Sequence, residues 1–195
     1  MKLRAFAIAA LIGATTISPA QAAPNYVFPI VGCDYTYAKA HHDYPATDIL
    51  AKAGCRYVAV TSGVIDEVNR VDSWSGKTNL GVDRGGLYVS FIGADGVRYY
   101  ASHLRTIPQS IQPGVEVKAG RLLGTVGATG SARGTKPHIH FGLSWSTPPQ
   151  TWWVRRGMVW PWKYLDAWKA GKDLSPAKEV EAKRLNVGDL PPEPK

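Results

Sequence analysis

The stretch Pro137-His138-Ile139-His140-Phe141-Gly142-Leu143 alternates between two kinds of residue along its length. In an extended chain Ile139, Phe141 and Leu143 would face one side, and the two histidines and Gly142 the other. This period of two is typical of a strand that buries one face. The open face would carry two imidazoles about 7 Å apart, which suits metal or proton chemistry. The alternative is a pair of ordinary edge-strand histidines.

Short runs rich in β-branched and aromatic residues lie on the N-terminal side of this stretch. Residues 56–60, 64–68, 87–92 and 97–103 indicate strands, and several shorter runs between 113 and 130 are separated by glycines. Such spacing is typical of a β-barrel or sandwich with sharp corners. We therefore predict an all-β, mainly antiparallel, barrel-like fold. Asp95-Gly96 predicts a two-residue hairpin turn, which would set Tyr99 opposite Ile92.

The composition changes after Trp145. Pro148-Pro149 marks a junction, and five of the seven tryptophans follow it, namely Trp152, Trp153, Trp160, Trp162 and Trp168. The pattern predicts a short helix over 161–170 and a second that begins at Ser175-Pro176. We expect these tryptophans to pack this segment onto the core, with a glycan-binding platform as the alternative. The predicted division is a domain over 24–147 and a helical, Trp-rich extension over 148–195 with a frayed tail.

The N-terminus has the pattern of a secretory signal peptide. Met1 to Arg4 is basic, Ala5 to Ile17 is apolar, and a small-residue cleavage site ends at Ala22. We predict that residues 1–22 are removed, with an uncleaved anchor as the alternative. No later segment has the length and apolarity of a membrane span. The expected product is exported, to the periplasm or to the outside and the cell wall, with no integral membrane association.

The charge and the two cysteines agree with export. The formal net charge is +8, and +6 once Lys2 and Arg4 are removed, which favours contact with anionic polymers such as cell wall. A merely solvated basic surface is the alternative. No dense basic run or reader motif predicts nucleic-acid binding. Cys33 and Cys55 predict a disulfide in an oxidising compartment, against the alternative of two free thiols.

All five histidines of the chain lie in three short segments. His41 and His42 precede Asp48, His103 ends a predicted strand, and His138 and His140 share the opening stretch. A catalytic zinc site takes three nitrogen or oxygen ligands and keeps a fourth position for water. Two histidines and one aspartate satisfy that need, and the remaining histidines can move protons or stabilise an oxyanion.

From about Val27 to Trp145 the chain resembles the lysostaphin/LytM-type zinc metallopeptidases, which are peptidoglycan endopeptidases. The matching motifs are the histidines before Asp48-Ile49, Gly63-Val64-Ile65, Tyr100-Ala101-Ser102-His103-Leu104, the glycine series from Gly114 to Gly130, and His138-Ile139-His140-Phe141. The resemblance implies an antiparallel β fold, one zinc ion per chain, and hydrolysis of peptide cross-links or bridges in peptidoglycan.

The resemblance also implies residue roles. His140 and Asp48 would bind zinc, and His103 and His138 would activate water and stabilise the tetrahedral oxyanion. The third ligand should be a histidine with three residues between it and the aspartate, but Tyr44 stands at that position. We expect His42 to replace it, with His41 as the substitute. A Cys33–Cys55 disulfide would then brace the ligand loop.

Three other interpretations remain. One is a catalytically inactive family member that binds peptidoglycan or activates another cell-wall hydrolase. The second is a different zinc hydrolase or lyase in which His138 and His140 are both ligands. A lipoyl-like carrier domain is the third, but the turn at Asp95-Gly96 lacks the lysine it would need. The sequence predicts no oligomeric state.

Overall fold

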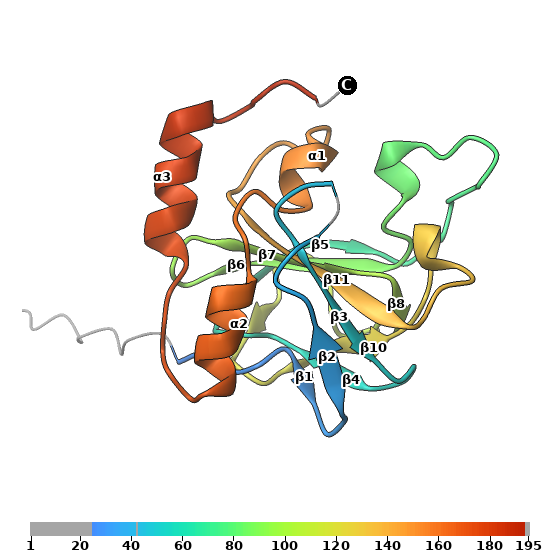
Figure 1. Ribbon diagram of the computed structural model, residues 1–195, viewed down its shortest axis with the longest axis horizontal. Coiled ribbons are helices and arrows are strands. Elements are labelled where there is room, and N and C mark those ends of the chain that lie inside the picture. Colours follow the sequence, from blue (N-terminus) through green and yellow to red (C-terminus); the bar gives the residue numbers. More distant parts are fainter. Residues whose placement is uncertain (1–24, 42, 194–195) are drawn as a thin grey trace, which may run out of the picture.

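The computed structural model describes residues 25–41 and 43–193, and within them two antiparallel sheets pack face to face (Figure 1). The larger sheet has the order β2-β3-β11-β7-β6-β5-β9. Its strands are Tyr35–Tyr37 (β2), Thr47–Ala51 (β3), His138–Ser144 (β11), Arg98–Ser102 (β7), Tyr88–Gly93 (β6), Gly63–Asn69 (β5) and Glu116–Val117 (β9). The smaller sheet is Ile30–Val31 (β1), Arg56–Val58 (β4), Leu122–Val126 (β10) and Leu104–Thr106 (β8). The predicted all-β, antiparallel fold is confirmed.

Strand β11 lies inside the larger sheet, between β3 and β7. Its apolar residues Ile139, Phe141 and Leu143 are fully buried in the core shared by the two sheets. Its other face carries the histidines, as the alternation predicted. The register sets His140 opposite Asp48 of β3 and opposite Ser102 of β7. The pairing of three strands therefore decides which polar side chains meet.

The β6–β7 hairpin differs from its prediction by one residue. Ile92 lies opposite Arg98 and not opposite Tyr99. The Gly93 amide donates to the Val97 carbonyl, so the loop has three residues and ends at Gly96 with φ +78°. A loop of three residues with a left-handed glycine is the next commonest hairpin after the two-residue turn. Because one residue inverts a strand's faces, Arg98, Tyr100 and Ser102 share the face of His140.

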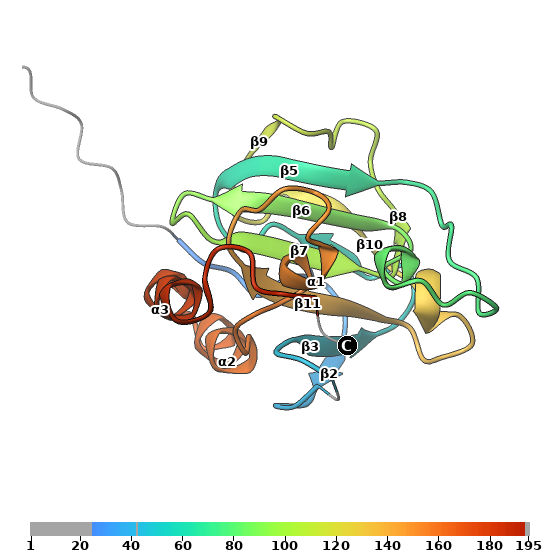
Figure 2. The same cartoon turned by 90° about the horizontal axis from the view of Figure 1, so that it is seen from above.

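Three helices follow the sheets: Trp152–Arg155 (α1), Trp162–Lys169 (α2) and Ala177–Val187 (α3). The helices α2 and α3 were predicted, whereas α1 was not. Trp168 of α2 is buried, stacks on Tyr26 with ring centroids 5.4 Å apart, and meets Phe141 edge-on at 6.3 Å. This tryptophan thus joins the extension to the core. Figure 2 shows α2 and α3 side by side at one end of the larger sheet.

A disulfide joins Cys33 and Cys55. It lies beyond the ends of the β2–β3 hairpin, whose connecting loop carries His41 and Tyr44. The predicted signal peptide over 1–22 lies outside the described residues. In the part of the chain that is described, no helix has the length and apolarity to cross a bilayer.

Candidate metal centre

Three side chains meet above the larger sheet. His140 of β11 lies with Nδ1 3.1 Å from Asp48 Oδ1, and His41, from the β2–β3 loop, lies with Nε2 3.9 Å from Asp48 Oδ2. One ligand atom from each residue falls within 4.8 Å of the other two. Zinc–nitrogen and zinc–oxygen bonds are about 2.0–2.2 Å long, so the spacing suits one shared ion with slight adjustment.

In the neutral rings of His41 and His140, the nitrogen that lies near Asp48 carries no proton, because the other nitrogen donates to a backbone carbonyl. His41 Nδ1 lies 3.2 Å from the Tyr44 carbonyl, which can only accept, so Nδ1 carries the proton and Nε2 has a lone pair. His140 Nε2 lies 3.2 Å from the Arg156 carbonyl, so Nδ1 has the lone pair. Two lone pairs and a carboxylate then converge, which is the donor set of a metal site.

Gly142 explains how the Arg156 carbonyl reaches His140. A Cβ atom at Gly142 would lie 1.8 Å from that oxygen. Gly142 is on the same face as His140, two residues further along β11, so its missing side chain leaves the space that the carbonyl occupies. Gly142 therefore makes room for the carbonyl that accepts a hydrogen bond from His140 Nε2.

Asp48 is held as a carboxylate. Burial alone would raise its pKa; without a metal, a protonated His140 donates Nδ1–H to Asp48, and this bond, with the charges of His140, His138 and His41, lowers the pKa to about 2. An anion at the centre of the three groups is what a cation site needs.

His103 and His138 form a second pair, with ring centroids 4.9 Å apart. His103 lies at the corner between β7 and β8, with φ +63°, a conformation that side chains other than glycine seldom adopt. Its Nδ1 lies 2.8 Å from the Thr129 carbonyl, and His138 Nδ1 lies 2.8 Å from the Lys136 carbonyl. Each Nδ1 therefore donates, and in the neutral rings each Nε2 is a free base.

The charge state of His103 follows from its surroundings. Burial, with the nearby His140 and His138, lowers its pKa to about 3. His103 is thus neutral at physiological pH, and its Nε2 carries a lone pair. Its ring centroid lies 6.3 Å from that of His140. The His103–His138 pair and the metal group (His41, Asp48 and His140) therefore face the same space.

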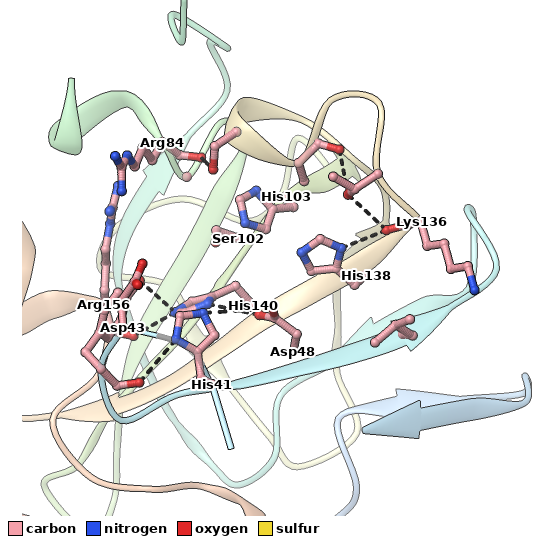
Figure 3. A pocket seen from close by; sticks show the side chains of 16 residues that line it. His41, Asp43, Asp48, Arg84, Ser102, His103, Lys136, His138, His140 and Arg156 are labelled. Atoms are coloured by element: carbon pink, nitrogen blue, oxygen red, sulfur yellow. Dashed lines mark hydrogen bonds and ion pairs between the residues drawn. The ribbon is translucent and has the colours of Figure 1, made fainter. Parts of the chain in front are cut away.

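That space is a cleft of about 420 Å³. Figure 3 shows the histidines in its middle, Arg84 and Arg156 at one end, and Lys136 at the other. The β5–β6 loop and the β10–β11 loop lie side by side (Figures 1 and 2) and both line the cleft. The Gly130 amide and Arg133 Nε both donate to Asp72 at 3.0 Å. These bonds fix the two loops to each other.

The structure brings His41, Asp48, His103, His138 and His140 into this one site. His42, the histidine preferred from the sequence, lies outside the described residues. Tyr44 stands where the usual spacing places a histidine, and its hydroxyl lies 3.3 Å from His140 Nε2. Sequence reasoning missed Arg156. The only signal was Gly142, whose need for space gives no hint of which segment fills it.

Comparisons with known proteins agree with this geometry. The model of peptidase family M23 matches residues 42–151, which is more than half of the chain. This chain belongs to peptidase family M23. That family is one of zinc peptidases, and the donor set of His41, Asp48 and His140 fits zinc in type and spacing. No relative was found among curated protein sequences.

Several solved structures are similar to this family member. The catalytic domain of the antimicrobial peptidase lysostaphin from Staphylococcus simulans is 26% identical, with 68% of this chain and 92% of that chain covered and a TM-score of 0.51. A further structure of the antimicrobial peptidase lysostaphin from Staphylococcus simulans is 28% identical with a TM-score of 0.52; the match covers 71% of this chain and 52% of that chain. LytM from Ruminococcus gnavus shares the fold at 20% identity, with 76% and 62% covered and a TM-score of 0.58.

Proposed function

We propose that this chain is an exported zinc metalloendopeptidase that hydrolyses peptide bonds in the cross-links or bridges of peptidoglycan. The observation that carries the proposal is the convergence of His41 Nε2, Asp48 and His140 Nδ1 beside a pair of histidines with free Nε2 atoms. The similarity to lysostaphin supports a cell-wall substrate, and the signal-peptide pattern of residues 1–22 supports export.

The roles follow from the atoms. His41, Asp48 and His140 would hold the zinc ion, which as a Lewis acid lowers the pKa of water and polarises a carbonyl. His103 is neutral, so its Nε2 can accept a hydrogen bond from the attacking water. His138 Nε2, once protonated, donates to the oxygen on which negative charge develops. The Arg156 carbonyl and Tyr44 fix the ring of His140.

Zinc content and peptidoglycan digestion test the proposal. The wild type should hold one zinc ion per chain and release soluble fragments from purified peptidoglycan. His140→Ala should lose the metal and the activity. His138→Ala should keep the zinc and lose most of the hydrolysis, because His138 donates no ligand here.

The third ligand is tested by two further variants. We propose His41, and expect His41→Ala to lose zinc while His42→Ala keeps it. Zinc loss in His42→Ala alone would return the role to His42, the choice made from the sequence.

An inactive, wall-binding member of the family is the second candidate. It takes over if the wild-type protein sediments with peptidoglycan but holds no zinc and leaves every peptidoglycan type intact.

A further inference from the structure

Three arginines are almost fully buried among the described residues, and two of them are matched by acids. Arg98 and Arg155 each contact both Asp66 and Glu67, at 2.6 to 3.0 Å. Arg156, which is 7% exposed, is different. No carboxylate within residues 25–41 and 43–193 forms an ion pair with its guanidinium. Its Nη2 donates to the Gly81 carbonyl, and its charge lies 4.6 Å above the Trp152 ring.

A buried cation without a counter-ion is unfavourable, because the lost hydration is only partly replaced by a carbonyl and an aromatic face. A carboxylate bound in the cleft beside Arg156 would supply the charge that the described chain does not pair with this guanidinium.

Arg84 lies at the same end of the cleft (Figure 3). Its Nε donates to Asn79 Oδ1 at 3.1 Å, and within the described chain its two terminal nitrogens have no hydrogen bond. The exposed Asp43 lines this end as well. The guanidinium groups of Arg84 and Arg156 therefore lie at the same end of the cleft, next to the metal group. A planar guanidinium binds a carboxylate with two parallel hydrogen bonds.

We propose that Arg84 and Arg156 form a carboxylate-binding subsite, and that the substrate peptide carries a free carboxylate close to the bond that is cut. This inference rests on the proposed function and narrows its substrate class. Stem peptides of peptidoglycan carry free carboxylates, whereas polyglycine bridges carry none within the bridge. The subsite thus selects stem-peptide cross-links over glycine bridges.

The extension after the family match provides this selectivity. Residue 156 lies beyond the matched range, which ends at 151. The α1 segment fixes both the Arg156 guanidinium over Trp152 and the Arg156 carbonyl on His140. One residue therefore orients the metal group through its backbone and selects the substrate through its side chain.

The test compares two versions of one substrate. A cross-linked stem-peptide dimer with free carboxylates is matched with the same dimer after conversion of those groups to carboxamides, and a pentaglycine peptide is the third probe. The wild type should cleave the acidic dimer with a kcat/KM about 10 to 100 times that for the amidated dimer, as expected for charge-assisted hydrogen bonds. Arg156→Gln should bring this ratio to within about threefold of unity, and Arg84→Gln should lower it partly.

Lys136→Gln is the matched control, because it removes a cation from the opposite end of the cleft. Its ratio should stay near that of the wild type. Equal losses on both dimers in Arg156→Gln would assign that side chain a purely structural role and overturn the proposal. A wild type that prefers pentaglycine or the amidated dimer would overturn it as well.

Binding separates this proposal from the proposed function. Calorimetry with chelator-treated protein should give tighter binding of the acidic dimer than of the amidated one, by about tenfold or more, and Arg156→Gln should abolish the difference. If the wild type shows this preference but cleaves nothing, the peptidase proposal fails and the carboxylate subsite stands. Equal binding of the two dimers contradicts the subsite.

Discussion

At the scale of single residues, Gly142 couples the metal group to the extension. An added methyl group would meet the Arg156 carbonyl at 1.8 Å, and overpacking of this kind costs about 1–3 kcal/mol. We expect Gly142→Ala to lower the free energy of unfolding by that amount and to weaken zinc binding, because the carbonyl must leave His140 Nε2. Urea unfolding and a competitive zinc titration measure the two effects.

Gly76→Ala is the control for this prediction. A Cβ there would lie 3.4 Å from the Trp74 ring, at the edge of ordinary contact, and Gly76 has no direct contact with the metal group. Zinc affinity in Gly142→Ala equal to that of Gly76→Ala would show that the carbonyl contact is not needed.

The pKa of His103 predicts how stability depends on pH. It is about 3 in the folded chain, against 6.5 in the unfolded chain, so between these values the unfolded state binds more protons. Stability is therefore present above pH 6.5 and is lost as the pH falls toward 3, by at most about 1.4 kcal/mol per pH unit. His103→Asn tolerates the left-handed backbone and should reduce this slope. Urea unfolding of chelator-treated protein between pH 7 and 4.5 measures it, and parallel curves for the two proteins would contradict it.

The sequence predicted that several residues of this cleft would lie near one another. His103, His138, His140 and Asp48 were chosen from alternation and family motifs, and all four lie in the cleft. Arg156 could not be chosen in this way, because its contact with His140 joins two segments whose pairing depends on tertiary packing. Nor could the sequence decide between His41 and His42 as the third ligand, because that choice depends on the conformation of the loop around Pro45.

At the scale of elements, the buried Arg98 of β7 and the half-buried Asp66 and Glu67 of β5 hold α1 in place. Arg98 contacts Asp66 and Glu67 and also donates to the Arg155 carbonyl, next to Arg156. Loss of one partner from a buried ionic network costs about 3–5 kcal/mol. We expect Arg98→Met to destabilise the fold by that amount and to weaken the acidic-dimer preference, since residues 155–156 lose their support.

Arg184→Met on α3 is the comparison. Arg184 pairs with Glu181 and Asp189 at the surface, where ion pairs contribute little. Thermal unfolding should hardly change in this variant. A similar loss in both variants would mean that burial of the Arg98 network contributes nothing beyond surface pairing.

The hairpin register shows the limit of turn signals at this scale. Asp95-Gly96 correctly predicted a hairpin, but the dipeptide fits both a two-residue turn and the last two positions of a three-residue loop. The choice depends on the whole sheet, because the observed register buries Val89, Phe91, Tyr99 and Ala101 together. Helix α1 was missed for a related reason, since four residues carry too little periodicity to predict a helix.

At the scale of the whole molecule, the disulfide restrains the hairpin that presents His41. Cys33 and Cys55 are separated by 22 residues, and closing such a loop stabilises a fold by about 3 kcal/mol in the chain-entropy model. We expect the Cys33→Ala/Cys55→Ala double variant to lose about that much in urea unfolding and to bind zinc more weakly. Unchanged zinc affinity in the variant would limit the disulfide to global stability.

The extension itself decides whether the proposed domain over 24–147 can fold alone. Trp168, Tyr164 and Leu165 of α2 belong to the same buried core as Phe141 and Tyr99, so truncation after residue 150 would open that core and remove the Arg156 carbonyl. By contrast, Val180 is the one buried residue of α3, and Glu179 joins the helix to Tyr164 and Lys163 of α2. We therefore expect truncation after 171 to lower the melting temperature yet leave a folded, zinc-binding protein.

Truncation after residue 150 should instead give a chain that aggregates or unfolds without a cooperative transition, because large buried side chains each contribute about 1.5–3 kcal/mol and whole domains are stable by only about 5–15 kcal/mol. Circular dichroism melting and zinc content of the two truncations measure the difference. A cooperative, zinc-binding protein ending at 150 would show that the segment matched by the family model is sufficient, and that α1 and α2 were added to a core already complete.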